Sequence, residues 1–245
     1  MTPDALTWLP YCGPAPAPGD WRWNLDPVLL ITLTAMAGLV VWRCRGRARG
    51  LGLAAVAVLI VIFVSPLCAT SSALFSARTV HHVLLVAVAA PLLAWMLPPR
   101  KVGSLTLATA AQAVILWAWH APAAYGAALS SDLIYWLMQA SLLGSAVWFW
   151  MGVRRASAPS AVGHLLVAMV AMGLLGALLT FADDPLYSPH LLTTMAWGLT
   201  PLEDQQAAGL IMWAPAAALY LAAALILLGR WIGPDRPVVR ADQSA

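Results

Sequence analysis

The segment 199–215, LTPLEDQQAAGLIMWAP, places two carboxylates and two amides at the start of a long apolar stretch. Thr200 and Glu203 have the spacing of a helix capping box, and Pro201 falls at the first helical position, where its missing N–H costs nothing. Ionisable groups at the mouth of a membrane-length helix are costly unless they have partners. We therefore expect a functional site here. Its candidate orienting or partner-binding residues are Glu203, Asp204 and Gln205.

Imidazole and thioether groups lie near this segment or near the ends of other apolar stretches. His81 and His82 lie near the start of one stretch, His120 ends the next, and Met212 follows Asp204 by eight residues. Nitrogen and soft sulfur ligands together suit copper, whereas carboxylates with imidazole would suit harder metals. Neighbouring residues on a helix point about 100° apart, so at most one of the adjacent histidines easily faces a given site. The pattern predicts a metal site formed by His82, His120 and Met212.

Simpler interpretations of the same residues stay open. A histidine near a helix end often bonds a backbone carbonyl, and this alternative applies to His82 and His120. His190 falls in a predicted loop and is expected to be solvated. Cys12 and Cys68 could form a disulfide, but sequence alone does not pair them. No CxxC or HExxH ligand pattern is present in the sequence.

The composition predicts the elements that must position these side chains. The chain is 62% hydrophobic and 9% charged, against about 25% charged residues in soluble domains, and its mean hydropathy is +0.81. We expect an all-α, polytopic membrane protein with an external N-terminal segment (1–24), a transmembrane domain (25–231) and a cytoplasmic tail (232–245). The seven predicted spans are 25–42, 51–64, 76–97, 102–119, 132–151, 162–181 and 206–231.

Basic residues predict the orientation of these spans. Of thirteen Lys and Arg residues, only Arg22 and Arg78 fall on one side. The others follow the first, third, fifth and seventh spans: Arg43, Arg45, Arg47, Arg49, Arg100, Lys101, Arg154, Arg155, Arg230, Arg236 and Arg240. Positive residues mark the cytoplasmic face, which places the N-terminus outside and the C-terminus in the cytoplasm. The net charge of +3 then reflects topology, and nucleic-acid binding is not predicted.

Small residues at helical spacing predict where spans pack closely. Gly173 and Gly176 share one predicted span, and Ala140 and Gly144 share another. Such residues allow two helix backbones to approach each other in a membrane.

Five sequence blocks, in order along the chain, carry a resemblance to a known family. They are SPL (65–67), LFSARTVHHVLLVAVAAPLLAW (74–95), LWAWHAPAAY (116–125), LLGALLTFADDPLY (174–187) and PLEDQQAAGLIMW (201–213). With them the chain resembles the CtaG family of bacterial cytochrome c oxidase assembly factors, first linked to caa-type oxidases. The resemblance implies a multi-pass protein of the bacterial plasma membrane that helps copper reach the oxidase and catalyses no covalent step.

The resemblance also implies a set of site residues and partners. The matched positions include His82, His120, Tyr125, Asp184, Tyr187, Glu203, Asp204, Gln205 and Gly209. The implied cargo is copper, held transiently. The implied partners are oxidase subunits and an external copper chaperone, with the lipid bilayer as the surroundings.

One position departs from the family pattern. Many members have a second histidine four residues before the one that matches His82, and here that position is Arg78. Arginine stays protonated and does not ligate a metal. Either His81 substitutes with altered geometry, or this branch handles copper less directly. We expect Arg78 to form an ion pair with Glu203 or Asp204.

Two alternatives to a copper-handling assembly factor remain. One is a haem-handling membrane protein with His82 and His120 as axial ligands. The other is a scaffold or transporter that holds no metal.

Overall fold

The computed structural model describes residues 10–98 and 103–233. Among these residues 80% are helical and none is in a strand, which confirms the all-α class. Each of the seven predicted segments contains a helix. In order these are α1 (Pro27–Arg43), α2 (Gly46–Phe63), the rod α4–η1–α5 (Phe75–Val83, Leu84–Ala89, Ala90–Met96), α6 (Leu105–His120), α8 (Asp132–Arg155), α9 (Ala158–Thr180) and the rod α10–η4–α11 (Pro201–Ile211, Met212–Ala216, Ala217–Ile232).

Five of these helices or rods are long and apolar enough to cross a membrane within the described chain: α2, α4–η1–α5, α8, α9 and α10–η4–α11. Helices α1 and α6, of 17 and 16 residues, are shorter apolar helices. The chain is therefore a multi-pass membrane protein by helix length and composition. The count of seven spans and the orientation of the termini stay predictions.

Two prolines explain why two of the rods are interrupted. The π-helical turn η1 ends two residues before Pro91, and the π-helical turn η4 contains Pro215. Proline has no N–H to donate to the carbonyl four residues earlier, so the regular helical hydrogen bonding is broken there. In both rods the helix continues after the wider turn, so each rod remains one long element.

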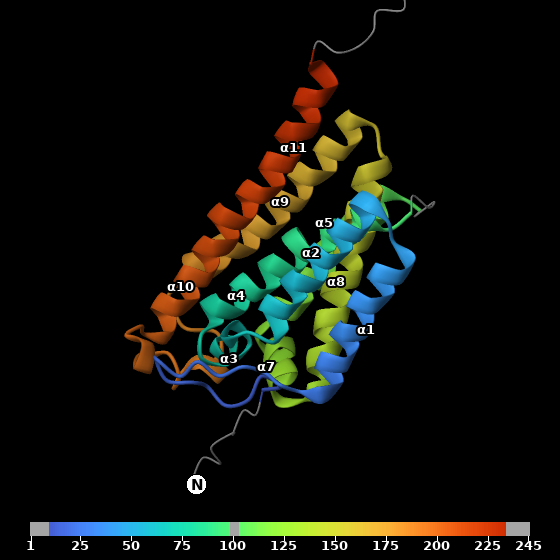
Figure 1. Ribbon diagram of the computed structural model, residues 1–245. Coiled ribbons are helices and arrows are strands. Elements are labelled where there is room, and N and C mark those ends of the chain that lie inside the picture. The colour runs from blue at the N-terminus through green and yellow to red at the C-terminus, as the bar shows by residue number, and fades with distance from the viewer. Residues whose placement is uncertain (1–9, 99–102, 234–245) are drawn as a thin grey trace, which may run out of the picture.

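Short elements gather at one end of the bundle (Figure 1). They are α3 (Pro66–Ala73), α7 (Pro122–Ser130) and the 181–200 loop, which contains the 3₁₀ turns η2 (Ser188–His190) and η3 (Met195–Trp197). We call these elements the cap. A disulfide between Cys12 and Cys68 joins the N-terminal segment to α3. The cap end is the end that the positive residues predict to be external.

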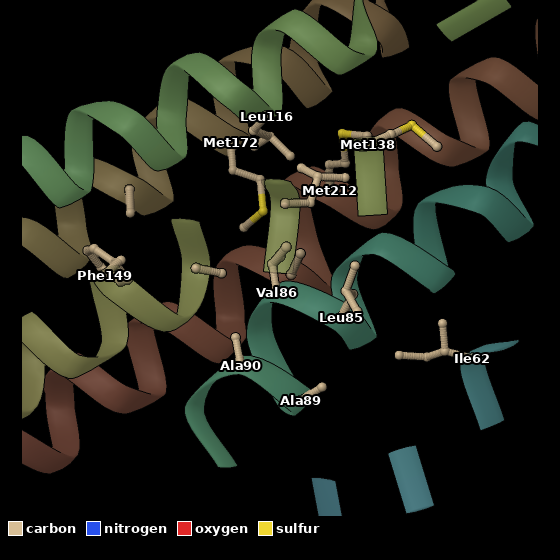
Figure 2. Close-up of a cluster of buried hydrophobic side chains, with 14 of the residues drawn as sticks. Ile62, Leu85, Val86, Ala89, Ala90, Leu116, Met138, Phe149, Met172 and Met212 are labelled. Carbon is tan, nitrogen blue, oxygen red and sulfur yellow. The ribbon is translucent and has the colours of Figure 1, made fainter. Parts of the chain in front are cut away.

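The core of the bundle is apolar and rich in methionine. Met138, Met172 and Met212 lie among Leu85, Val86 and Leu116 in the cluster of Figure 2. All three methionine side chains are buried, and they come from α8, α9 and η4. Because methionine is flexible, it fills irregular gaps in a helical core.

Helices α9 and α10 meet through a pair of glycines. A Cβ on Gly176 would lie 2.7 Å from the carbonyl oxygen of Gly209, so no larger residue fits there without displacing the backbone. The predicted close packing at Gly176 is confirmed. The prediction for Gly144 is wrong, because a Cβ there would have no heavy atom within 4 Å. Small-residue spacing identifies a possible contact face but does not reveal whether another helix reaches it.

Candidate functional site

The site begins with a carboxylate that caps another helix. Asp204, fully buried in α10, accepts hydrogen bonds from the backbone N–H of Phe75 (2.6 Å) and Ser76 (3.2 Å) and from the Ser76 hydroxyl. These are the first residues of α4, which has no capping side chain of its own. A negative charge at a helix N-terminus satisfies free N–H groups and complements the helix dipole. Asp204 therefore fixes the start of α4 and the direction of the side chains that follow.

Helix α4 then directs a cluster of polar side chains into the bundle. Arg78, His81 and His82 are all buried, at 0–2% exposure. The His82 ring meets the His120 ring edge to face, with centroids 5.6 Å apart, while His81 packs against Phe63. The two adjacent histidines thus face different neighbours, as the helical spacing predicted. The structure brings His82 and His120 together from α4 and α6.

The hydrogen bonds of these histidines leave most ring nitrogens without a partner. Nδ1 of His120 lies 2.7 Å from the Leu116 carbonyl, which can only accept, so Nδ1 carries the hydrogen. Nε2 of His120 is then the nitrogen with a lone pair, and it has no hydrogen-bond partner. Both ring nitrogens of His81 and of His82 are also unpartnered. His120 therefore bonds a carbonyl, as the simpler interpretation expected, but through one nitrogen only.

Arg78 does not form the ion pair that we expected. Its guanidinium nitrogens are buried and make no hydrogen bond of acceptable geometry. Asp204 is engaged at the start of α4, and exposed Glu203 closes the predicted capping box by accepting from the N–H (2.7 Å) and hydroxyl of Thr200. Both carboxylates already have backbone partners, so neither is left for the arginine. The polar neighbours of Arg78 are the hydroxyls of Tyr125 and Tyr135, and its Cζ lies 5.4 Å from the Tyr135 ring centroid.

The cap closes over this cluster through His190, which we expected to be solvated. The side chain is only 2% exposed. Its Nδ1 donates to the Ala73 carbonyl (3.2 Å), and its Nε2 accepts from the Tyr125 hydroxyl (2.7 Å). Burial lowers the pKa of His190 to about 4, more than the Ala73 hydrogen bond raises it. The loop position suggested exposure, but the loop folds back between α3 and α7.

Two further motif residues attach the 181–200 loop to the helices. The Tyr187 hydroxyl donates to the His120 carbonyl (2.7 Å), and its ring stacks on Phe75 with centroids 3.9 Å apart. Gln205 accepts from the N–H of Leu186 (2.7 Å) and donates to the carbonyl of Asp184 (3.3 Å). Asp184 contributes this backbone oxygen while its own side chain is in an exposed position.

The motif residues of the predicted site thus build one connected structure: a capped helix, a buried cluster and a cap that covers it. Residues 36–233 match the family of cytochrome c oxidase caa3 assembly factors (Caa3_CtaG). The chain belongs to this family. The match spans nearly the whole chain and confirms the resemblance seen in the sequence blocks. Comparison with curated proteins and with solved structures found no match.

In this member of the family, the predicted copper ligands occupy two levels. His82 and His120 touch directly beneath the cap, whereas Met212 lies deeper, in the apolar cluster of Figure 2. Among the described residues, no three His, Cys, Asp or Glu side chains are grouped in a way that could hold a metal ion. A closed metal cage built from those residue types is therefore absent from this part of the chain.

Two residues of the caa3 assembly factor's site were not singled out from the sequence. Ser76 binds Asp204 through both its N–H and its hydroxyl, and Tyr135 places its ring near Arg78. Tyr135 is fully buried, and a tyrosine inside an apolar segment is a signal that could have found it. Ser76 gave no such signal, because its role depends on a helix more than 100 residues away.

Proposed function

We propose that the chain helps to load copper into an oxidase subunit at the outer face of the bacterial plasma membrane, with His82 and His120 as transient ligands. The observation that carries the proposal is the pair of touching, buried imidazoles whose lone-pair nitrogens have no hydrogen-bond partner. An unpartnered buried polar atom costs about 1–3 kcal/mol. A metal ion that binds these nitrogens would recover that cost.

The hydrogen bond to Leu116 supports His120 as a ligand in particular. Histidines that bind metals usually donate their other ring N–H to a carbonyl or carboxylate, which orients the ring and selects the tautomer. His120 has this arrangement before any metal binds, with Nδ1 on the carbonyl and Nε2 toward the cluster. Met212 would act as a softer third ligand only after a shift of the core, because it lies in the apolar cluster below.

Arg78 influences which copper ion suits the site. Coulomb repulsion doubles with the charge of the ion, so a buried guanidinium nearby penalises Cu(II) twice as much as Cu(I). The same repulsion weakens binding overall, which suits a site that must release its cargo. The arginine thus favours transient binding of Cu(I). His81, next to His82 on α4, is a further buried imidazole close to the arginine.

Transfer would require the cap to open. His82 and His120 are 2–3% exposed beneath it, so a partner could not reach them in this conformation. We propose that an oxidase subunit or an external copper chaperone displaces the 181–200 loop from α3 and α7. In the same proposal Glu203, exposed at the cap end, contacts the partner, and no covalent step is catalysed.

The test is an anaerobic Cu(I) titration of the purified full chain against a chromophoric chelator. We expect about one Cu(I) per chain, and at least tenfold weaker binding in His82→Ala and in His120→Ala. His164→Ala is the matched control, since His164 binds Thr106 and Ser160 far from the cap and should not matter. The oxidase of a deletion strain complemented with each variant should lose copper in parallel.

Two outcomes would favour the alternatives. Full oxidase metallation with both histidines replaced would indicate a scaffold or transporter that holds no metal. A Soret band in the purified protein that disappears in His82→Ala and His120→Ala would indicate haem handling instead.

A further inference from the structure

A cavity of about 600 Å³ lies apart from the histidine cluster, between α1, α2 and α8. Helix α1 packs on α2, and residues of α1, α2 and α8 line the cavity together. Val28 and Thr32 line the cavity and are both exposed. The cavity is therefore open at the side of the bundle, where lipid would surround a multi-pass protein.

The lining of the cavity changes from polar to apolar along its length. Asp26 and Asp132, at the starts of α1 and α8, lie at the cap end. Leu33, Met36 and Leu143 line the deeper part. Leu143 follows Asp132 by eleven residues, a rise of about 16 Å along the helix. Such a gradient matches the shape of an amphiphile with a polar head and an apolar tail.

Aromatic rings form the walls beside the two carboxylates. Tyr11 meets the Trp136 ring edge to face at 5.0 Å, and Phe63 lies 5.3 Å from the same ring. Aromatic faces and carboxylates together attract a cationic amine. Phe63 also packs edge to face against His81, so an occupant of the cavity would contact a ring that touches the histidine cluster.

Gln139 is a polar residue in the apolar wall of the cavity. It is 2% exposed, its polar neighbour is the Tyr135 hydroxyl, and its amide makes no hydrogen bond of ideal geometry. Buried amides are almost always hydrogen-bonded, since no water replaces the missing partner in a membrane. Gln139 lies seven residues below Asp132, about 10 Å deeper, where a carbonyl close to a lipid headgroup could reach it.

We propose that this cavity binds one membrane lipid with an amine headgroup, of the phosphatidylethanolamine type. The ammonium lies near Asp26 and Asp132, and one acyl chain follows Leu33 and Met36. A glycerol ester carbonyl accepts from Gln139 once that side chain turns toward the cavity. The two carboxylates disfavour an anionic lipid.

The test is native mass spectrometry of the full chain, released from detergent with either phosphatidylethanolamine or phosphatidylglycerol added. We expect the wild type to retain one phosphatidylethanolamine with at least a tenfold preference over phosphatidylglycerol. Leu33→Trp fills the cavity and should abolish this adduct. Asp26→Asn with Asp132→Asn should remove the preference while leaving the cavity open, since asparagine at position 26 still caps α1 and Asp132 makes no capping hydrogen bond.

The control is Leu178→Trp, an equal change on the lipid-facing surface of α9, where the side chain is 59% exposed. It should keep the adduct. If Leu33→Trp does not fold, Thr32→Trp at the exposed edge blocks the same entrance. Gln139→Leu should raise the unfolding midpoint in lipid-free detergent and reduce the gain that phosphatidylethanolamine provides.

Three results would overturn the proposal: equal retention of phosphatidylglycerol, a phosphatidylethanolamine adduct that survives in Leu33→Trp or Thr32→Trp, or loss of the adduct in Leu178→Trp. None of these measurements involves copper, so they are independent of the proposed copper transfer.

Discussion

At the scale of single residues, the position of a charge decides its role. Asp204 and Glu203 are neighbours in the same motif, yet Asp204 is buried against the start of α4 and Glu203 is exposed on its own capping box. Asp204 lies on α10 but fixes the start of α4, and so it positions Arg78, His81 and His82 on that helix. Glu203 is free on its outer side to meet a partner.

Replacing Asp204 should therefore lower the free energy of unfolding far more than replacing Glu203. In Asp204→Asn the amide N–H₂ meets the donors of Phe75 and Ser76, so charge-assisted hydrogen bonds are lost. We expect the free energy of unfolding to fall by about 2 kcal/mol or more. Glu203→Gln keeps an acceptor for Thr200 and should change it by less than about 0.5 kcal/mol. Thermal unfolding in detergent compares the two, and equal effects would contradict the role of Asp204.

His190 should make the cap sensitive to pH. The folded protein holds His190 neutral, with its pKa lowered to about 4 by burial, whereas an unfolded histidine protonates near pH 6.5. As the pH falls, the unfolded state gains the proton first, so stability is lost between about pH 6.5 and pH 4. His190→Gln keeps groups for Ala73 and Tyr125 but cannot titrate. The unfolding midpoint of this variant should fall less over that range, and identical pH profiles would count against the assignment.

At the scale of elements, close backbone contact and proline positions shape the two rods. The rod α10–η4–α11 approaches α9 at Gly176 and Gly209, one turn before the π-helical turn that contains Pro215. The close contact brings the start of α10, and with it Asp204, within reach of α4. The close packing of α9 on α10 and the contact of Asp204 with the start of α4 thus depend on each other.

Adding one methyl group at this contact should be destabilising. Gly176→Ala or Gly209→Ala would force a Cβ against backbone atoms of the other helix, and overpacking of this kind costs about 1–3 kcal/mol. Gly173→Ala is the control on the same helix, because its nearest heavy atom would lie at an ordinary 3.7 Å. Thermal unfolding in detergent should rank Gly173→Ala close to wild type. A loss as large as that of Gly176→Ala would refute the contact.

At the scale of the whole molecule, the cap end and the opposite end differ in the residues and elements that they carry. The cap end carries the short helices, the disulfide and the covered histidines. The opposite end carries Arg43, Arg45, Arg154 and Arg155, while Arg100, Lys101, Arg236 and Arg240 lie outside the described residues. The predicted orientation would place the cap outside the cell, where a copper donor and an oxidase subunit could reach it.

Cysteine labelling tests this orientation. Cys44 is the free cysteine, at the end opposite the cap, and Leu192 in the cap is 92% exposed. A membrane-impermeant maleimide should label Leu192→Cys in intact cells, whereas wild-type Cys44 should react only after lysis. Labelling of Cys44 in intact cells would place the C-terminus outside.

Many features of this protein could be predicted from residues that are close together in the sequence. The seven helical segments, the capping box of Thr200 and Glu203 and the family identity were all predicted, because hydropathy, helix caps and motif letters depend on residues close in the chain. The short helices α3 and α7 were not, since they are too short to give a membrane-length signal.

Only the tertiary structure decided how distant residues pair. Asp204 turned out to bind the start of α4 and not Arg78, His190 to be buried and not solvated, and Gly144 to be open where Gly176 is closely packed. The physical reason is the same in each case. A polar side chain or a glycine has several suitable partners, and which one it meets depends on how helices far apart in the sequence cross.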